Sequence, residues 1–526
     1  MFKKLGTLLL LTFVVSAHAE KTFVYCSEAS PKTFNPQLAE DGATFNATSQ
    51  MLYNRLVEFE RGTTKVIPAL AEKWTVSKDG LTYTFSLRKG VKFHTTENFK
   101  PTRPLNADDI LFSFNRALKA DHPFHKVSGG NYIYYKGMEL DKLITDIKKV
   151  DDYTVKFVLK QPEAPFLANL AMSFAIILSA EYGEQVMKAG APDKIDTDPV
   201  GTGPFVLKRF VKDNSIRYEA HPDYWKGKAK IDKIVFAITP DASVRFQKLK
   251  AGECHLVAEP APQDLKGMES NPKIKLMSQP GANVGYLAFN VEKAPFDKVE
   301  VRKAVEFALN RPYYIDAIYQ GTATVARQPI PPTVWGSSPN LKNYDYNLEK
   351  AKTLLKQAGW PNGFEAELAT LPVSRPYNPN GKKMGELMQA DLAKIGIKVK
   401  LVTYDWPTYL DKGKKGEFQM MQLGWTTDNG DPDNFMGVLL TCGAIDAANY
   451  ARWCNKEYDQ FIAKAKLVTD MKKRTGFYNK AEKIFKDQVP WVTLAHATVY
   501  RGLAKNVEGY KISPLGVEDF YPIEMK

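Results

Sequence analysis

Between residues 366 and 425 the apolar pattern changes from a strand period to a helix period and back, and this alternation constrains the fold more than any other feature. Strands are predicted over 366–371, 397–401 and 419–425. Between the first two, Gly396 ends a helix whose apolar face is Met384, Leu387, Met388, Leu392 and Ile395. Strand, helix, strand is a βαβ unit, and such units build mostly parallel sheets. The predicted fold class is therefore α/β.

An earlier part of the chain is typical of a smaller α+β domain. Residues 81–88 alternate apolar and polar side chains, and the same alternation returns at 155–159. Between them, Asn106 precedes two acidic residues and an apolar helical face, which predicts a capped helix. Two more amphipathic helices are predicted over 301–309 and 348–358.

The first 19 residues have the pattern of a secretory signal peptide. Lys3 and Lys4 precede an apolar stretch at 5–15, and Ala17-His18-Ala19 is an A-x-A cleavage site. Cleavage after Ala19 and export are therefore expected. The first cysteine is Cys26, too far from the cut to accept a lipid, so the exported chain is expected to be soluble.

Composition and charge exclude other classes of protein. The remaining chain has no apolar run long enough to span a membrane, and 44% hydrophobic with 25% charged residues is a globular composition for two or three domains. The formal net charge is +13, but the lysines are spread among acids with no basic arm. No nucleic-acid partner is expected.

Four cysteines in an exported chain allow three disulfide pairings. Cys442 and Cys454 are close enough in sequence to close one loop. Cys26 and Cys254 would then join an early segment to a middle one, which would make the first domain discontinuous in sequence. The cysteine spacing fits no zinc pattern.

Signatures of catalysis and of metal binding are missing. The chain has no G-x-S-x-G, H-E-x-x-H or G-x-x-x-x-G-K-[ST] motif, so no catalytic residue is predicted. His122 and His125 form the only close histidine pair, and an ordinary loop is the favoured interpretation. Asp428 begins an acidic cluster with Asp431 and Asp433, but the cluster lacks the glycine and glutamate positions of an EF-hand. No metal and no cofactor are expected, although the cluster could anchor a cationic group.

Several segments together resemble one known family over essentially the whole exported chain, including its four cysteines. They are Tyr25–Glu28, Ala71–Trp74 with 81–93, Leu105–Asp109, Gly201–Phe205, Val284–Leu287 with Asn290, Arg375–Asn380, and Gly424–Trp425 with Asp428–Phe435. These segments are similar to the bacterial periplasmic peptide-binding proteins of ABC importers, and the last two groups resemble its dipeptide-binding branch.

The resemblance implies a two-lobed periplasmic binding-protein fold, of type II and the large peptide-binding class, with an inserted α+β domain. Domain I is expected to combine 20–53, 200–280 and 498–526. Domain II is expected at 54–199 and domain III at 281–497.

The resemblance also implies a ligand site. Asp428 matches the acid that holds a peptide ammonium, and Arg375 matches the arginine that holds the peptide carboxylate, a pairing that suits a zwitterion. Both follow predicted strands of one βαβ region, so they could face each other across one crevice and measure peptide length. The backbone of Gly424, Trp425 and Thr426 could pair with the peptide as an added strand.

The expected function is therefore that of a non-enzymatic, monomeric substrate-binding component of a dipeptide ABC importer in the periplasm. Its partners would be dipeptides and the inner-membrane permease subunits, with a chemoreceptor and haem left open. The alternatives are a binding protein of the same fold for haem, a metal chelate or longer oligopeptides, and an exported peptide hydrolase.

Overall fold

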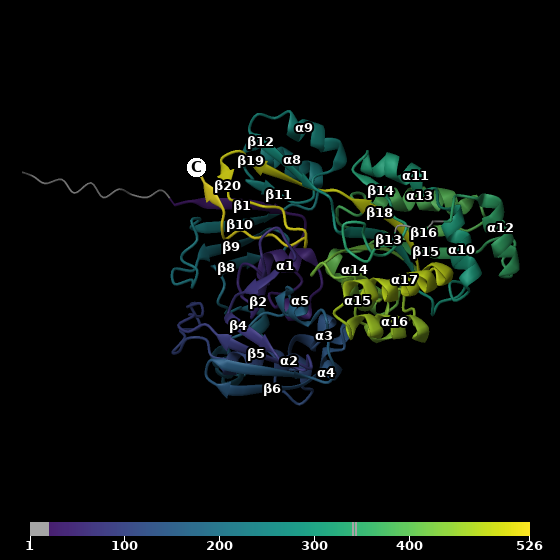
Figure 1. Cartoon of the computed structure of the whole chain (residues 1–526). Coiled ribbons are helices and arrows are strands. Elements are labelled where there is room, and N and C mark those ends of the chain that lie inside the picture. Colours follow the sequence, from purple (N-terminus) through teal and green to yellow (C-terminus); the bar gives the residue numbers. More distant parts are fainter. Residues whose placement is uncertain (1–19, 339–340, 342–343) are drawn as a thin grey trace, which may run out of the picture.

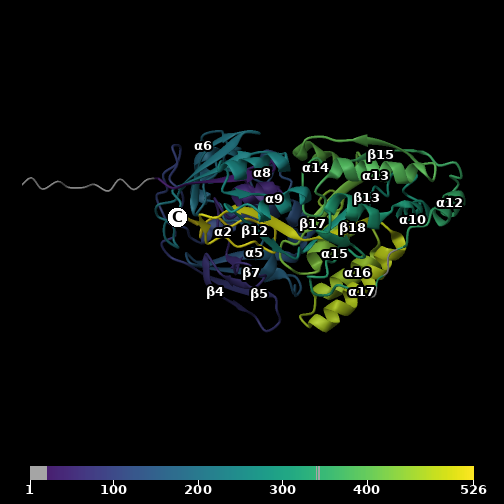
Figure 2. The same cartoon turned by 90° about the horizontal axis from the view of Figure 1, so that it is seen from above.

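The computed structural model describes residues 20–338, 341 and 344–526, and it has two lobes (Figure 1). The expected signal peptide at 1–19 lies outside the described residues. Seen from above, the lobe that carries α10–α17 is set beside the lobe that carries the N-terminal strand (Figure 2). In the described part of the chain, no helix is both long enough and apolar enough to cross a membrane.

The first lobe is built on a seven-stranded sheet. Its strands, in spatial order, are β12 (Ile274–Gln279), β19 (Val499–Ala504), β11 (Leu256–Val257), β1 (Thr22–Ser27), β10 (Lys233–Ile238), β9 (Ser215–Ala220) and β8 (Phe205–Val211). Strand β1 is central and parallel to both of its neighbours, β10 and β11. Three stretches far apart in sequence thus share one sheet. On this basis we propose the domain division that the resemblance implies, with 20–53, 200–280 and 498–526 in domain I.

A separate antiparallel sheet lies below the first lobe in Figure 1. It consists of β4 (Ala71–Val76), β5 (Thr82–Leu87), β7 (Thr154–Leu159) and β6 (Ile144–Asp151), and it packs on α2 (Ala107–Leu118). The predicted strands at 81–88 and 155–159 are confirmed by β5 and β7. The predicted cap is also confirmed, because Asn106 and Asp109 form a capping box at the start of α2.

The second lobe contains the βαβ unit. Its six strands, in order, are β14 (Ala323–Val325), β18 (Trp491–Ala497), β13 (Asn283–Phe289), β17 (Met420–Thr426), β15 (Glu365–Ala369) and β16 (Lys398–Val402). β15 is parallel to β16 and β17, which confirms the βαβ prediction. The expectation of a mostly parallel sheet is wrong, because β13 and β18 carry the chain into and out of this lobe and run antiparallel to their neighbours.

Helices cover both faces of this sheet. The three predicted helices are confirmed as α10 (Val299–Ala308), α12 (Leu348–Gln357) and α13 (Gly381–Ala393). The others that matter for the site are α14 (Trp406–Lys414), α15 (Asp433–Leu440), α16 (Lys456–Lys466) and α17 (Met471–Gln488). A buried apolar cluster fills the space between the sheet and α10, α12 and α13.

The chain passes between the two large sheets at two adjacent places within the described residues. β12 ends at Gln279 and β13 begins at Asn283, while β18 ends at Ala497 and β19 begins at Val499. The side chain of Asn283 ties the crossings together: its Nδ2 donates to the Ala497 carbonyl at 2.9 Å, and its Oδ1 accepts from the Ala497 N–H at 2.9 Å. Two neighbouring strand connections of this kind form a hinge.

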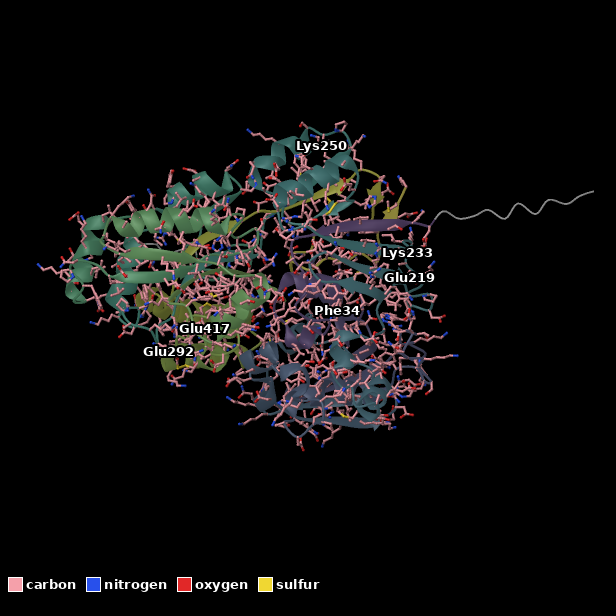
Figure 3. All side chains as sticks on the ribbon, turned by 180° about the vertical axis from the view of Figure 1, so that it is seen from behind. Phe34, Glu219, Lys233, Lys250, Glu292 and Glu417 are labelled. Carbon is pink, nitrogen blue, oxygen red and sulfur yellow. A yellow bond between two sulfur atoms is a disulfide. The ribbon has the colours of Figure 1, made fainter. Side chains whose placement is uncertain are left out.

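Side-chain contacts hold the two lobes together. Lys414 Nζ of the second lobe lies 2.8 Å from Glu40 Oε1 of the first, and Lys466 Nζ lies 3.3 Å from Glu163 Oε1 beside the antiparallel sheet. Asn429 Nδ2 also donates to Asn169 Oδ1 at 2.9 Å. These contacts across the interface define a closed arrangement of the lobes. From behind, Glu292 and Glu417 mark the second lobe, and Lys233 and Lys250 mark the first (Figure 3).

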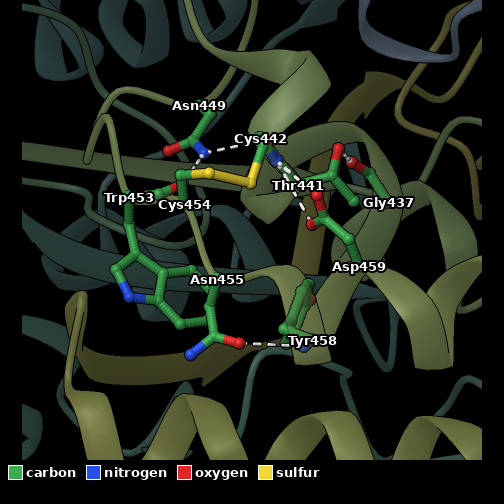
Figure 4. The surroundings of a disulfide bond; sticks show 9 residues. All are labelled: Gly437, Thr441, Cys442, Asn449, Trp453, Cys454, Asn455, Tyr458 and Asp459. Carbon is green, nitrogen blue, oxygen red and sulfur yellow. Dashed lines mark hydrogen bonds between the residues drawn. A yellow bond between two sulfur atoms is a disulfide. The ribbon is translucent and has the colours of Figure 1, made fainter.

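Both disulfides join the cysteines that the sequence favoured. Cys26 at the end of β1 is bonded to Cys254, so the central strand is tied to the segment before β11. Cys442 is bonded to Cys454 and closes the loop between α15 and α16 (Figure 4). Asn449 crosses the same loop, because its Nδ2 donates to the carbonyls of Thr441 and Trp453.

Candidate ligand-binding site

A cavity of about 100 Å³ lies between the lobes. The second lobe contributes the end of β17 and the loop that follows β15, and the first lobe contributes α1 (Gly42–Thr48), β19 and the segment 513–517. Because β15 and β17 are adjacent and parallel, their carboxyl ends meet at the edge of the sheet that faces the first lobe. Arg375 and Asp428 follow these two ends, and both line the cavity.

Asp428 is a carboxylate without a cationic partner. Its Oδ2 accepts hydrogen bonds from Tyr134 Oη at 2.9 Å and from Asn434 Nδ2 at 3.1 Å. No lysine, arginine or histidine nitrogen of the described residues lies within 4.0 Å of it. Burial raises the pKa of Asp428 to about 7, although the hydrogen bonds from Tyr134 and Asn434 lower it. The site therefore holds an acid whose ionisation a ligand cation would favour.

Arg375 is buried and is already paired on one side. Its Nη1 donates to Glu28 Oε1 at the end of β1, whereas its Nη2 has no hydrogen-bond partner in the described part of the chain. Burial opposes the charged forms of both Arg375 and Glu28. The attraction between the two side chains, with that of neighbouring charges, outweighs the effect of burial, so the pKa of Arg375 is raised and the pKa of Glu28 is lowered. The guanidinium therefore stays charged with one donor nitrogen unused.

Two glycines on neighbouring strands make room for the loop that carries Arg375. Gly285 of β13 and Gly424 of β17 lie opposite each other in the sheet register. A Cβ atom would lie 2.2 Å from the Tyr377 carbonyl oxygen at Gly285 and 2.2 Å from the Tyr377 ring at Gly424. Tyr377 thus lies directly on the sheet, and this contact fixes the loop against it.

The end of β17 presents an open backbone edge. Its ladder with β13 continues to Thr426, but its ladder with β15 ends at Met421. Within the described residues, the stretch 422–426 therefore has a strand partner on one side only. Gly424, Trp425 and Thr426 also line the cavity. This edge is available to an extended backbone.

The first-lobe wall of the cavity is charged but balanced. Arg501 Nη2 lies 3.2 Å from Glu259 Oε1, and its Nε donates to Glu518 Oε1 at 2.6 Å. Arg245 uses its guanidinium on backbone carbonyls, including those of Ala258 and Glu259. These groups satisfy one another. Among the described residues that line the cavity, Glu40 Oε2, Trp406 Nε1 and Arg375 Nη2 are buried without a hydrogen-bond partner, and Asp428 lacks a cationic partner.

The other two acids of the cluster have structural roles. Asp431 forms a bidentate ion pair with Arg474, at 2.7 and 2.8 Å, and also accepts from the N–H of Asp433 at the start of α15. Asp433 is buried close to Lys466. Among the described residues, no group of His, Cys, Asp and Glu side chains is arranged to hold a metal ion.

Sequence reasoning missed three residues of the site: Glu28, Tyr134 and Tyr377. Gly424 lies inside the strand predicted over 419–425, and a glycine inside a strand is a signal for close backbone approach, so it could have pointed to the contact with Tyr377. Glu28 and Tyr134 reach the site only through the contact between lobes, so no local pattern reveals them.

A two-lobed α/β fold, a hinge of two strand crossings and an interlobe cavity that holds an acid without a cationic partner and an unused guanidinium nitrogen define a solute-binding protein. The family model for bacterial extracellular solute-binding proteins, family 5, matches residues 65–447. The chain belongs to this family.

Individual relatives cover nearly the whole chain. The dipeptide-binding protein of Escherichia coli (strain K12) is 52% identical over 524 residues, which are 99% of this chain and 98% of that one. Heme-binding protein A of Haemophilus influenzae is 47% identical over 507 residues, 96% of this chain and 93% of that one. A crystal structure of the dipeptide binding protein from Pseudoalteromonas sp. SM9913 in complex with Met-Leu has a TM-score of 0.94 at 38% identity, covering 96% of this chain and 100% of that one.

Proposed function

We propose that the protein binds free dipeptides between its lobes, with Asp428 holding the ammonium and Arg375 Nη2 the carboxylate. One observation carries the proposal: these two side chains line one buried cavity, and each has an unused group for the opposite charge. Burying either end of a zwitterion without such a partner costs several kcal/mol.

The remaining geometry favours short, extended peptides of varied sequence. The open edge of β17 at Gly424–Thr426 would pair with the peptide backbone, which is common to all sequences. Two fixed charges at the ends of neighbouring strands would select for length, because each added residue of extended chain moves a terminus by about 3.3–3.6 Å.

Export and delivery follow from this role. The protein would enter the periplasm by its signal peptide, with cleavage after Ala19, and act there as a monomer. Closure on a dipeptide would bring parts of both lobes into one surface for the inner-membrane permease of an ABC importer. The protein would catalyse no reaction itself, in keeping with the solute-binding family to which it belongs.

The test is calorimetric titration of ligand-free protein, prepared by unfolding and refolding, with Ala-Ala, N-acetyl-Ala-Ala, Ala-Ala amide and tetra-alanine. Tight binding of Ala-Ala, with large losses for the acetylated and amidated forms, is expected. Equal affinity for the blocked forms would contradict the charge assignments, and absence of Ala-Ala binding would contradict the function.

Haem is a second candidate, favoured by the name of the relative from Haemophilus influenzae. The residues that line the described cavity include no histidine, cysteine or methionine, and Tyr377 and Tyr450 are the side chains there of a type that can bind haem iron. A haem titration in the presence of saturating Ala-Ala distinguishes a shared site from a separate one.

A further inference from the structure

A second, larger cavity opens beside the Asp428 end of the site. Its volume is about 670 Å³, and it shares Asp428, Ser513, Leu515 and Val517 with the first cavity. The other walls come from β2 (Val57–Phe59) and the end of α5 (Phe166–Ala171), which Figure 1 shows between the seven-stranded sheet and the antiparallel sheet. The first residue of a peptide whose ammonium lies on Asp428 would therefore have this cavity beside its side chain.

Most charges of the second cavity are paired. Lys226 Nζ lies 2.5 Å from Glu58 Oε1, and Arg61 Nε lies 3.0 Å from Asp519 Oδ2. Glu60 lies 3.7 Å from Lys65 outside the cavity. Three charged residues of the cavity have no ion-pair partner among the described residues: Arg55, Lys511 and Asp428. Once a ligand ammonium neutralises Asp428, two positive charges are left without a partner.

Arg55 is the more unusual of the two. Only 2% of the residue is exposed, and no carboxylate of the described residues lies within 4.0 Å of its guanidinium. Nη1 donates to the Ser49 carbonyl and Nη2 to Gln50 Oε1, both at 3.1 Å, whereas Nε has no hydrogen-bond partner within the described ranges. The carboxylates of Glu58 and Asp519 act on this guanidinium only at longer range, and each has its own ion-pair partner. A buried guanidinium whose direct acceptors are all neutral attracts anions in the neighbouring cavity.

We propose that this second cavity selects peptides with an acidic first residue, through the positive charges of Arg55 and Lys511. The proposal rests on the proposed function, because the ammonium on Asp428 is what places the first side chain there. Lys511 lies at the exposed side of the cavity, and its side chain runs along the turn between β2 and β3 (Val66–Pro68), with its Cδ 3.9 Å from where a Cβ of Gly62 would be. It can reach a carboxylate without rearrangement of the core.

The test compares two peptides that differ only in charge. Dissociation constants of Glu-Ala and Gln-Ala are measured at pH 8 and about 0.01 M salt, where screening is weak. The wild type is expected to bind Glu-Ala at least about fivefold more tightly. Lys511→Glu should abolish or reverse this preference for Glu-Ala, and Arg55→Met should reduce the preference. Lys250→Met, at an exposed site far from the cavity, should leave it unchanged.

Ala-Glu and Ala-Gln place the charge on the second residue, so their ratio should not respond to Lys511→Glu. Replacing the buried Arg55 can also affect folding, so the decisive variant is Lys511→Glu, which changes an exposed side chain. Equal binding of Glu-Ala and Gln-Ala, or a preference that persists in Lys511→Glu, would overturn the inference while Ala-Ala binding still supports the proposed function. Failure of Ala-Ala to bind would overturn both.

Discussion

Asp428 should make dipeptide binding depend on pH. Burial raises its pKa to about 7 in the unliganded protein, and only the ionised form attracts an ammonium. The peptide ammonium itself loses its charge with a pKa of about 8, so affinity for Ala-Ala should be highest between about pH 7 and pH 8. Below pH 7 it should fall toward about tenfold per unit, or about 50-fold between pH 7.5 and pH 5. Calorimetric titration with Ala-Ala across this pH range measures the change in affinity.

In Asp428→Asn the pH dependence should be lost, together with about 2–5 kcal/mol of binding free energy. The unliganded variant should gain stability above pH 7, because a carboxyl whose folded pKa is raised loses its stabilisation as pH rises through that pKa. Asp487→Asn, at an exposed ion pair, is the matched control. A pH-independent wild-type affinity would remove Asp428 from the ammonium site.

Arg375 should matter for stability as well as for binding. Arg375→Met leaves Glu28 buried without its partner, and breaking a buried pair typically costs about 3–5 kcal/mol. The double variant Glu28→Leu/Arg375→Met removes both charges, so it should recover most of the stability without recovering binding. Urea unfolding and Ala-Ala titration separate the two effects. Recovery of affinity in the double variant would contradict the assignment of Arg375 to the ligand.

At the scale of single elements, β17 should tolerate no side chain at Gly424. An added Cβ would lie 2.2 Å from the Tyr377 ring, so Gly424→Ala should destabilise the protein by about 1–3 kcal/mol and weaken binding by displacing the Arg375 loop. Gly476 in α17 has open space around it, so Gly476→Ala should instead stabilise by about 1 kcal/mol. Thermal unfolding of both variants compares them directly.

The two disulfides should differ in their effect on stability. In the chain-entropy treatment, closing a loop of 228 residues stabilises by about 5 kcal/mol and one of 12 residues by about 3 kcal/mol. Cys26→Ala/Cys254→Ala should therefore lower the urea midpoint more than Cys442→Ala/Cys454→Ala does. Neither pair lines the cavity, so one dipeptide per chain should still bind. The reverse order would show that local packing outweighs loop length.

Helices and strands could be predicted from the sequence where a local pattern of side chains is enough to specify them. The periodicity around residues 81–118 and 348–402 placed strands and helices that the structure confirms, and a capping residue such as Asn106 marked a helix start. Strand direction could not be predicted. β13 and β18 run antiparallel to their neighbours because they take the chain into and out of the second lobe, and local periodicity contains no information about that path. The site was predictable only in part: Asp428 and Arg375 came from family resemblance, whereas Glu28 and Tyr134 come from the other side of the cleft.

At the scale of the whole molecule, contacts remote from the ligand should tune affinity. Lys466 is the cation beside Glu163 and Asp433 at the interface between lobes, and burial raises the pKa of Glu163 to about 7. Lys466→Met should therefore disfavour closure and weaken Ala-Ala binding at pH 8 by about tenfold. The loss should shrink near pH 6, where Glu163 takes up a proton.

Small-angle scattering should show a smaller radius of gyration for wild-type protein with Ala-Ala than without it, and Lys466→Met should need more peptide to reach the same value. Lys483→Met changes an exposed ion pair on α17 and serves as the control. Unchanged affinity in Lys466→Met would show that the interlobe contact does not contribute to closure.

The paired crossings beside Asn283 have a practical consequence. Because both connections lie together, rotation of one lobe displaces a point in proportion to its distance from them. The helices α8 (Ala242–Ala251) and α12 stand on opposite lobes, with α12 at the far end of the second (Figure 1). Donor and acceptor dyes attached to α8 and α12 would convert hinge rotation into a change in energy-transfer efficiency. This chain is therefore a scaffold for an optical biosensor of short peptides.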